Sequence, residues 1–262
     1  MSESSIQDVL NNRVVNSEPR SYSGLSGVGN KCYRALQYAH YWAFKDSYSA
    51  RVERLFNVGH AAEEIMINDL QSQGLTVHSD QKEIIGFAGH WKGHIDGIID
   101  DDFLWEAKTH NDKSFSDLKK KRVQESKPLH YSQVTAYMGY LGLPQALYMA
   151  INKNNSEYYL EYVDFDEDHF KEIKVKTADI ITTDVLFKRI GTGRPSWFEC
   201  KFCNASDVCF GLKKPETNCR TCQHVNVLDK GQWQCGKNDA ILSVDEQRAG
   251  CSDYELSEML KN

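Results

Sequence analysis

The chain has 262 residues, of which 40% are hydrophobic and 26% are charged, a balance typical of a globular protein. No apolar run approaches the roughly 20 residues needed to span a bilayer, and the first residues, MSESSIQDVLNNR, lack the basic and apolar regions of a secretory signal. We therefore expect a cytoplasmic protein with no membrane partner. The net charge of −6 gives no indication of a nucleic-acid partner. A nucleic acid would have to bind local basic stretches such as 117–122 and 170–176. The alternative is that these stretches are solvent-exposed helix faces with no binding role.

Taken in chain order, the hydrophobic pattern predicts an α/β protein. Helical spacing covers 30–44 and 51–74, and Gly74 ends the second helix. Stretches rich in β-branched and aromatic residues, separated by turn signals that include the run Asp100–Asp102, then predict strands. The remaining expected elements are strands at 75–87, 90–100 and 102–110, a polar and basic segment at 111–127, a helix at 129–142 after Pro128, strands at 145–154 and 156–166, and a helix over about 167–190.

After Pro195 the composition becomes rich in cysteine, glycine and polar residues. Seven of the eight cysteines lie in this part of the chain, and intracellular Cys-x-x-Cys pairs favour metal ligation over disulfides. We predict a main domain over 1–214 and a small Cys-rich module over 215–262. The module offers few apolar residues, so a bound metal would have to organise it.

The stretch KGHIDGIIDDDFLWEAKTH, residues 92–110, carries three charges that a hairpin would bring together. Residues two apart on a strand share a face, so Glu106 and Lys108 point one way while Trp105, Ala107 and Thr109 point towards a core. An antiparallel partner strand would place Asp96 near that charged face. Two neighbouring carboxylates repel unless a cation lies between them, and oxygen ligands suit Mg²⁺ or Mn²⁺. Such a centre could cleave phosphodiesters, with Lys108 orienting a water; the alternative is an ordinary solvent-facing Glu–Lys pair.

Two neighbouring helices strengthen this interpretation. On the helix at 51–74, His60 lies three and four residues before Glu63 and Glu64, so these side chains share a face. On the helix at 129–142, Gln133 and Tyr137 lie four apart and can reach one point. Each pattern alone would also fit an ordinary amphipathic helix.

In this order the motifs GHAAEE, HIDG, EAK and QVTAY, over about residues 51–142, resemble the PD-(D/E)XK nuclease superfamily and its RecB-like branch. The resemblance implies a mixed β-sheet flanked by helices, metal ligation by Asp96, Glu106 and the carbonyl of Ala107, and a catalytic Lys108. It also implies DNA contacts by Gln133 and Tyr137.

The helical motif departs from the family pattern. The family commonly shows Gly-x-x-x-His-Glu, whereas here Gly59 directly precedes His60 and Glu63 follows four residues after Gly59. Both His60 and Glu63 are therefore candidates for completing the metal site.

A first set of cysteines has the spacing Cys-x2-Cys-x5-Cys at Cys200, Cys203 and Cys209, and Cys32 is the spare fourth ligand. Four thiolates suit Zn²⁺ or an iron–sulfur cluster, and the spacing alone does not choose between them. One N-terminal cysteine followed by this C-terminal triplet resembles the iron–sulfur staple of AddB-type nucleases and CRISPR-associated RecB-like exonucleases. The resemblance implies a structural [4Fe–4S] cluster that closes the ends of the nuclease domain.

A second set comprises Cys219, Cys222, Cys235 and Cys251, with His224 able to replace one of them. The spacing suits a structural Zn²⁺ site, with free surface thiols or a second iron centre as alternatives.

We predict from these patterns a Mg²⁺- or Mn²⁺-dependent DNA exonuclease, acting on single strands or ends during DNA processing or recombination. The alternatives are a non-enzymatic iron–sulfur DNA-binding or recruitment protein on the same fold and a structure-specific endonuclease. Intact Asp96, Glu106 and Lys108 favour the enzyme. No G-x-x-x-x-G-K-[ST] motif occurs, so no unwinding activity is expected. The family resemblance implies a phage or prokaryotic source, with recombination or replication proteins as candidate partners.

Overall fold

The computed structural model describes residues 3–78 and 82–261, and these residues form two compact units. Unit 1 comprises residues 1–17, 47–84 and 93–173, and unit 2 comprises residues 18–46, 85–92 and 174–262. The division differs from the predicted boundary at residue 214, because 215–262 group with earlier segments rather than by themselves. In the described part of the chain no helix is long and apolar enough to cross a membrane.

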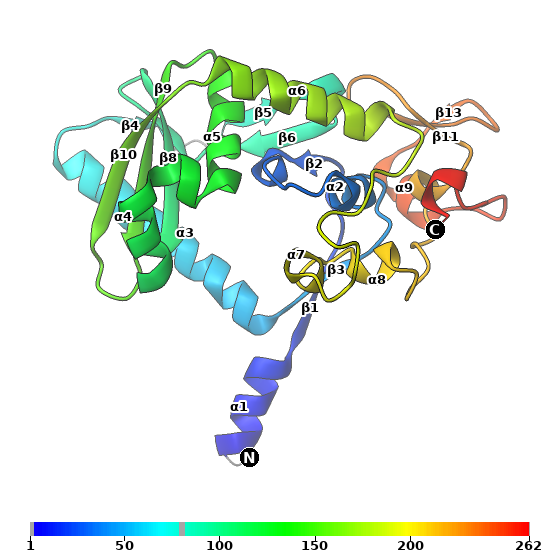
Figure 1. The fold of residues 1–262 in the computed structure, drawn as a ribbon, viewed down its shortest axis with the longest axis horizontal. Helices are drawn as coiled ribbons and strands as arrows, with labels where there is room; N and C mark the ends of the chain where they lie inside the picture. The colour runs from blue at the N-terminus through cyan, green and yellow to red at the C-terminus, as the bar shows by residue number, and fades with distance from the viewer. Residues whose placement is uncertain (1–2, 79–81, 262) are drawn as a thin grey trace. The chain divides into compact units, whose positions relative to one another are not determined.

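Unit 1 contains a five-stranded mixed sheet with the strand order β10-β9-β8-β7-β4 (Figure 1). The pairs β4–β7, β7–β8 and β9–β10 are antiparallel, and β8–β9 is parallel. The strands are β4 (Val77–His78), β7 (Gly97–Ile99), β8 (Phe103–His110), β9 (Gln145–Asn152) and β10 (Tyr158–Asp164). The predicted pair of later strands is therefore confirmed, and so is the hairpin into β8. Only residues 97–99 of the strand expected at 90–100 take part in that hairpin, because residues 91–94 form a separate strand in another sheet.

Helices cover both faces of this sheet. Ala62, Met66 and Leu70 of α3 (Ala50–Ser72) pack against Trp105, Leu147, Met149 and Ile151 on one face. On the other face lie α4 (Asp112–Ser126) and α5 (Pro128–Leu141), which join β8 to its parallel neighbour β9 (Figure 1). A crossover of this kind is needed because parallel strands cannot be joined by a tight turn. The other elements in or starting in unit 1 are α1 (Glu3–Asn12), β1 (Val14–Ser17), which forms a two-stranded sheet with β3 (Asp46–Ser49), β5 (Glu83–Ile85) and α6 (Glu167–Thr182).

Three of the expected segments differ from the prediction from sequence. Helix α4 occupies the segment predicted only as polar and basic, and its N-cap Asn111 accepts a hydrogen bond from the Ser114 amide at 2.9 Å. Helix α6 ends at Thr182, eight residues earlier than predicted. The predicted strand at 75–87 appears as β4 and β5, and its middle part, residues 79–81, lies outside the described residues.

Unit 2 is built from segments far apart in the sequence. Its core cluster contains Tyr38, Tyr41, Ala43, Ala205, Val208, Trp233 and Leu260. Its helices and strands are β2 (Ser23–Gly24), η1 (Leu25–Gly27), α2 (Tyr33–His40), η2 (Phe87–Gly89), α7 (Phe198–Lys201), α8 (Ser206–Cys209), η3 (Cys219–Thr221), β11 (Val225–Val227), β12 (Trp233–Cys235), β13 (Ala240–Ile241), α9 (Val244–Ala249) and η4 (Glu258–Leu260), while β6 (Trp91–His94) starts here and pairs in parallel with β2.

Backbone contacts join residues 88–90 to residues 228–231 in this unit. The Gly231 amide donates to the Ala88 carbonyl at 2.8 Å, and His90 Nε2 lies 2.7 Å from the Leu228 carbonyl oxygen. Gly89 and Gly231 both have positive φ, and a Cβ on either would lie within 2.7 Å of the opposite backbone. Only glycine permits so close an approach.

Candidate active site

The β7–β8 hairpin positions the predicted charged residues. Gly97 pairs with Trp105 and Ile99 with Phe103. Extending this register by one residue places Asp96, directly before β7, opposite Glu106. The turn contains Asp100 and Asp101, which both adopt positive φ, as a tight hairpin connection requires.

Glu106 is the buried centre of this group. Its side chain is 0% exposed, and its Oε2 atom has no hydrogen-bond partner among the described residues. Burial raises the pKa of Glu106 to about 7, with Lys108 acting in the opposite direction and Asp96 adding to the rise. A buried acceptor without a partner is costly and calls for a ligand or a proton.

Lys108 and Asp96 surround the Glu106 carboxylate. Lys108 Nζ contacts Glu106 Oε1, donates to the Ala107 carbonyl at 3.1 Å and lies 3.9 Å from Asp96 Oδ2. Burial acts to lower the pKa of Lys108, but the Glu106 and Asp96 carboxylates outweigh it and raise the pKa. Asp96 Oδ2 also accepts from the Ala107 amide at 2.8 Å, which fixes its direction. Lys108 therefore keeps its charge between two carboxylates.

Glu63, on α3, is the third carboxylate of the group. Burial raises the pKa of Glu63, and the nearby Asp96 carboxylate raises it further, while His60 and Lys108 act to lower it. Glu63 is half-buried, whereas His60 is exposed. The structure thus brings Glu63, Asp96, Glu106 and Lys108 together, with His60 next to Glu63.

Glu63, Asp96 and Glu106 offer carboxylate oxygens, which are suitable ligands for a divalent cation. In residues 3–78 and 82–261, no group of three or more His, Cys, Asp or Glu side chains is arranged, as it lies, to hold a metal ion. The unpaired Glu106 Oε2, the Asp96 carboxylate and the Glu63 carboxylate nevertheless supply hard oxygen ligands, which Mg²⁺ and Mn²⁺ prefer.

A histidine–tyrosine network adjoins Glu106 and was not expected from the sequence. In the β8–β9 register Glu106 is paired with Tyr148, whose Oη lies 3.0 Å from His110 Nε2 and 2.8 Å from His130 Nδ1. Burial, together with the charge of nearby lysines, lowers the pKa of His110 to about 4 and that of His130 to about 3. Both histidines are therefore neutral at pH 7. Only the pairing of distant strands reveals this network.

Gln133 and Tyr137 lie inside unit 1. Gln133 is 7% exposed and Tyr137 1% exposed, and Gln133 Nε2 donates to Tyr137 Oη at 3.4 Å. The Tyr137 ring fills the space above Gly93, where an added Cβ would lie 2.5 Å from the ring. Their DNA contact stays a prediction.

The first cysteine set lines one small cavity in unit 2. Cys32, Cys200, Cys203 and Cys209 border it, together with apolar side chains. Burial raises the pKa of Cys200 and that of Cys203, and the neighbouring thiols raise both further. All eight cysteines are free. The four thiols around this cavity come from distant parts of the chain, because Cys32 lies 168 residues before Cys200.

The second cysteine set lines another cavity, of about 400 Å³, in the same unit. Cys219, Cys222, Cys235, Cys251 and His224 all border it. Burial raises the pKa of Cys219, and the neighbouring thiols raise it further, with Cys251 having the largest effect, then Cys222, then Cys235.

Arg220, between two of these cysteines, is buried with its guanidinium 3.6 Å from the Trp42 ring centroid and 4.3 Å from that of Trp233. It anchors the segment in the unit 2 core.

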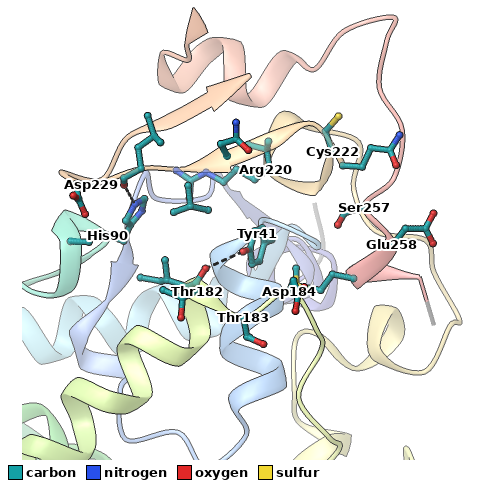
Figure 2. Close-up of a pocket in the computed structure, with 18 of the residues that line it drawn as sticks. Tyr41, His90, Thr182, Thr183, Asp184, Arg220, Cys222, Asp229, Ser257 and Glu258 are labelled. Carbon is teal, nitrogen blue, oxygen red and sulfur yellow. Dashed lines mark hydrogen bonds between the residues drawn. The ribbon is translucent and has the colours of Figure 1, made fainter. Parts of the chain in front are cut away.

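A further cavity, of about 900 Å³, also belongs to unit 2 (Figure 2). Tyr41, His90 and Thr182–Asp184 line it together with Arg220 and Cys222 (Figure 2). Tyr41 Oη donates to the Ile181 carbonyl at 3.4 Å. None of Glu63, Asp96, Glu106 or Lys108 borders this cavity, so its size does not mark the charged site.

No protein-family model matches the chain, and no curated protein matches it. Among solved structures, it is similar to the alkaline exonuclease LHK-Exo from Laribacter hongkongensis, with 15% identity and a TM-score of 0.46 over 62% of this chain and 87% of that one. LHK-Exo in complex with dAMP gives 14% identity and a TM-score of 0.45 over 61% and 86%. Both TM-scores lie below 0.5, so the site residues have to be judged by their own geometry.

Proposed function

We propose that the chain is a metal-dependent deoxyribonuclease of the PD-(D/E)XK type, acting as an exonuclease on single-stranded DNA or DNA ends. The observation that carries the proposal is the buried Glu106 carboxylate. Its Oε2 has no hydrogen-bond partner in residues 3–78 and 82–261, while Lys108 and Asp96 lie beside it. A structural ion pair would satisfy both oxygens. An unpaired oxygen next to two further carboxylates fits a cation site.

Each residue has a definite role in this proposal. Asp96, Glu106 and the Ala107 carbonyl would hold Mg²⁺ or Mn²⁺, and Glu63 or His60 would complete the set. The bound ion would supply a Lewis acid for the phosphoryl oxygen and a water of lowered pKa. Lys108, whose pKa is raised, stays protonated and donates to the attacking water or the developing negative charge.

The test is cleavage of labelled DNA by single variants of the full chain. Asp96→Ala, Glu106→Ala and Lys108→Ala are each expected to lower the rate by on the order of 10²-fold or more, as for other groups that stabilise developing charge. Glu64→Ala is the matched control, because Glu64 neighbours Glu63 on α3 but is exposed. Unchanged Mg²⁺-dependent cleavage by Lys108→Ala would overturn the assignment.

The exonuclease part of the proposal has a separate test. Circular single-stranded DNA has no ends, so an exonuclease leaves it intact while degrading the same strand once it is linear. Cleavage of the circle would favour a structure-specific endonuclease, and binding without cleavage of either form would favour a DNA-binding protein.

We further propose two structural metal centres in unit 2. Cys32, Cys200, Cys203 and Cys209 would hold a [4Fe–4S] cluster, supported by their shared small cavity. Cys219, Cys222, Cys235 and Cys251, or His224 in place of one of them, would hold Zn²⁺.

Metal analysis of anaerobically prepared protein separates the two centres. Cys203→Ser is expected to lose iron and the visible absorption while keeping zinc, and Cys235→Ser is expected to lose zinc while keeping iron. Each variant is the control for the other. Loss of both metals from either one would show that the centres are not independent.

A further inference from the structure

Residues 188–214 of unit 2 present aromatic rings to solvent. Phe198 is 72% exposed and Phe202 is 70% exposed, on and immediately after α7, and their ring centroids lie 5.5 Å apart at an interplanar angle of 69°. Phenylalanine is among the residues most often buried. Two neighbouring exposed phenyl rings are therefore available for contact with a binding partner.

The rings are held on an ordered scaffold. The Lys201 amide donates to the Trp197 carbonyl at 2.8 Å, and the Trp197 amide donates to the Arg194 carbonyl at 3.0 Å. The Trp197 ring packs against Gly191, where an added Cβ would meet it at 2.3 Å. On the same helix Cys200 is buried in the four-thiol cavity. The rings thus lie on and directly after a short helix whose first turn is hydrogen-bonded to the preceding residues.

The segment that carries the two rings has a net charge opposite to that of the chain. Residues 188–214 contain six basic residues (Lys188, Arg189, Arg194, Lys201, Lys213 and Lys214) against two acidic ones (Glu199 and Asp207), a local charge of 6 − 2 = +4 in a chain of −6. All six basic residues are exposed. Lys213 pairs with Asp207 at 2.8 Å, and of the described carboxylates none pairs with Lys188, Arg194, Lys201 or Lys214. A polyanion fits this surface better than an apolar protein face does.

We propose that residues 188–214 bind single-stranded DNA, with bases stacked on Phe198 and Phe202 and phosphates beside Lys201, Arg194 and Lys188. Exposed aromatic rings among cations are the usual means of holding unpaired bases, because every base has a π-face and duplex DNA hides it. This inference rests on the proposed nuclease function, whose substrate form it specifies.

The experiment measures binding apart from cleavage. Full-length protein carrying Glu106→Gln is titrated into fluorescein-labelled oligo(dT) and into a blunt duplex of the same length, and anisotropy gives Kd. Adding Phe198→Ala and Phe202→Ala is expected to raise Kd for oligo(dT) by roughly tenfold or more, the loss expected for one or two base stacks. Kd for the duplex is expected to stay unchanged.

Three further variants make the outcome decisive. Phe198→Tyr with Phe202→Tyr keeps both rings and is expected to restore binding. Phe56→Ala removes another exposed ring, 53% exposed and 5.6 Å from Tyr48 in an edge-to-face pair, and is expected to leave Kd unchanged. Lys201→Ala is expected to reduce the salt dependence of oligo(dT) binding by roughly one phosphate contact.

Three results would overturn the proposal. These are an unchanged Kd in the double alanine variant, an equal loss on duplex DNA, or self-association through the rings without any binding of oligo(dT). Circular dichroism and bound metal of each variant, compared with the parent, exclude misfolding. Hydrolysis of bis(p-nitrophenyl) phosphate by protein with Glu106 intact reports the catalytic centre alone. If that protein cleaves neither this diester nor DNA, the nuclease proposal fails. The Kd values for oligo(dT) still test, independently, whether residues 188–214 bind single-stranded DNA.

Discussion

At the scale of single residues, the dominant feature is the cost of keeping Glu106 inside the protein. A carboxylate without water favours its proton, which is why its pKa rises to about 7. Lys108 offsets only part of that cost, since it serves Asp96 and the Ala107 carbonyl as well. The site is thus built at the expense of stability, as functional sites often are.

A pH dependence of stability follows for metal-free protein. Because the pKa of Glu106 is higher in the folded chain than in the unfolded chain, the folded state binds more protons between about pH 4.5 and 7. The free energy of unfolding therefore falls as pH rises through this range, by about 3 kcal/mol at most. Glu106→Gln removes this dependence. Denaturant unfolding of both proteins at pH 5 and pH 8 checks it, and parallel losses would contradict it.

Tyr148 gives a second prediction at this scale. Its hydroxyl is the partner of both His110 and His130. Tyr148→Phe therefore removes the partner of one ring nitrogen in the buried His110 and of one in the half-buried His130. We expect a loss of roughly 1–3 kcal/mol in the free energy of unfolding. Tyr162→Phe, at an exposed position on the neighbouring strand β10, is the control and should change little. A neutral Tyr148→Phe would mean that water replaces the hydroxyl.

At the scale of elements, β6 and α5 meet where Tyr137 covers Gly93. Gly93→Ala places a methyl group 2.5 Å from the ring, so the helix or the ring must move, at a cost of about 1–3 kcal/mol. Gly59→Ala is the matched control. Gly59 lies within α3 with no heavy atom within 4 Å of an added Cβ, so this change should stabilise the protein by about 0.5–1 kcal/mol.

Thermal unfolding of the two glycine variants gives the comparison. Combining Gly93→Ala with Tyr137→Leu should cost less than the sum of the two single changes, because the shorter side chain frees the space. Strict additivity would show that the close contact is relieved elsewhere.

The hairpin of β7 and β8 and the helix α4 show which elements could be predicted from the local sequence and which could not. The hairpin of β7 and β8 was predictable because alternation and the turn aspartates act locally, and Trp105 and Ala107 do face the core cluster. Helix α4 was not, because it buries only Phe115, Leu118 and Val123 and depends on distant partners. At its kink Arg122 has a φ of 63°, and Glu161 of β10 accepts from the Arg122 side chain and the Val123 amide, both at 3.0 Å.

The candidate site divides in the same way. Asp96, Glu106 and Lys108 belong to one hairpin, so their meeting was predictable from strand periodicity. His110, His130 and Tyr148 meet only because β8 pairs in parallel with β9 across two helices. Long-range pairing of this kind leaves no local pattern in one sequence.

At the scale of the whole molecule, unit 2 depends on residues beyond the predicted boundary at 214. The Asn218 side chain donates to the Trp42 carbonyl at 2.9 Å, Arg220 donates to the His40 carbonyl at 3.1 Å, and Trp233 belongs to the unit 2 core. Asn218, Arg220 and Trp233 thus contribute to the part of unit 2 that contains α2.

Truncation after Lys214 tests this dependence. We expect amide protection from hydrogen exchange to fall over 33–40 and 198–209, because their core partners are lost, and to persist over β8 and β9 of unit 1. Glu255→Ala in the full chain, an exposed change in the same tail, is the control. Full protection of 33–40 after truncation would show that 215–262 form a separate module.

The backbone contact between residues 88–90 and 228–231 also sets an order of events during synthesis. A nascent chain leaves the ribosome from its N-terminus, so unit 1 has all its segments once residue 173 has emerged. Residues 18–46 and 85–92, with the rings of Tyr38 and Trp42, must wait until 218–233 are made. The pace of translation across 174–233 therefore sets how long these apolar segments stay accessible to chaperones and proteases.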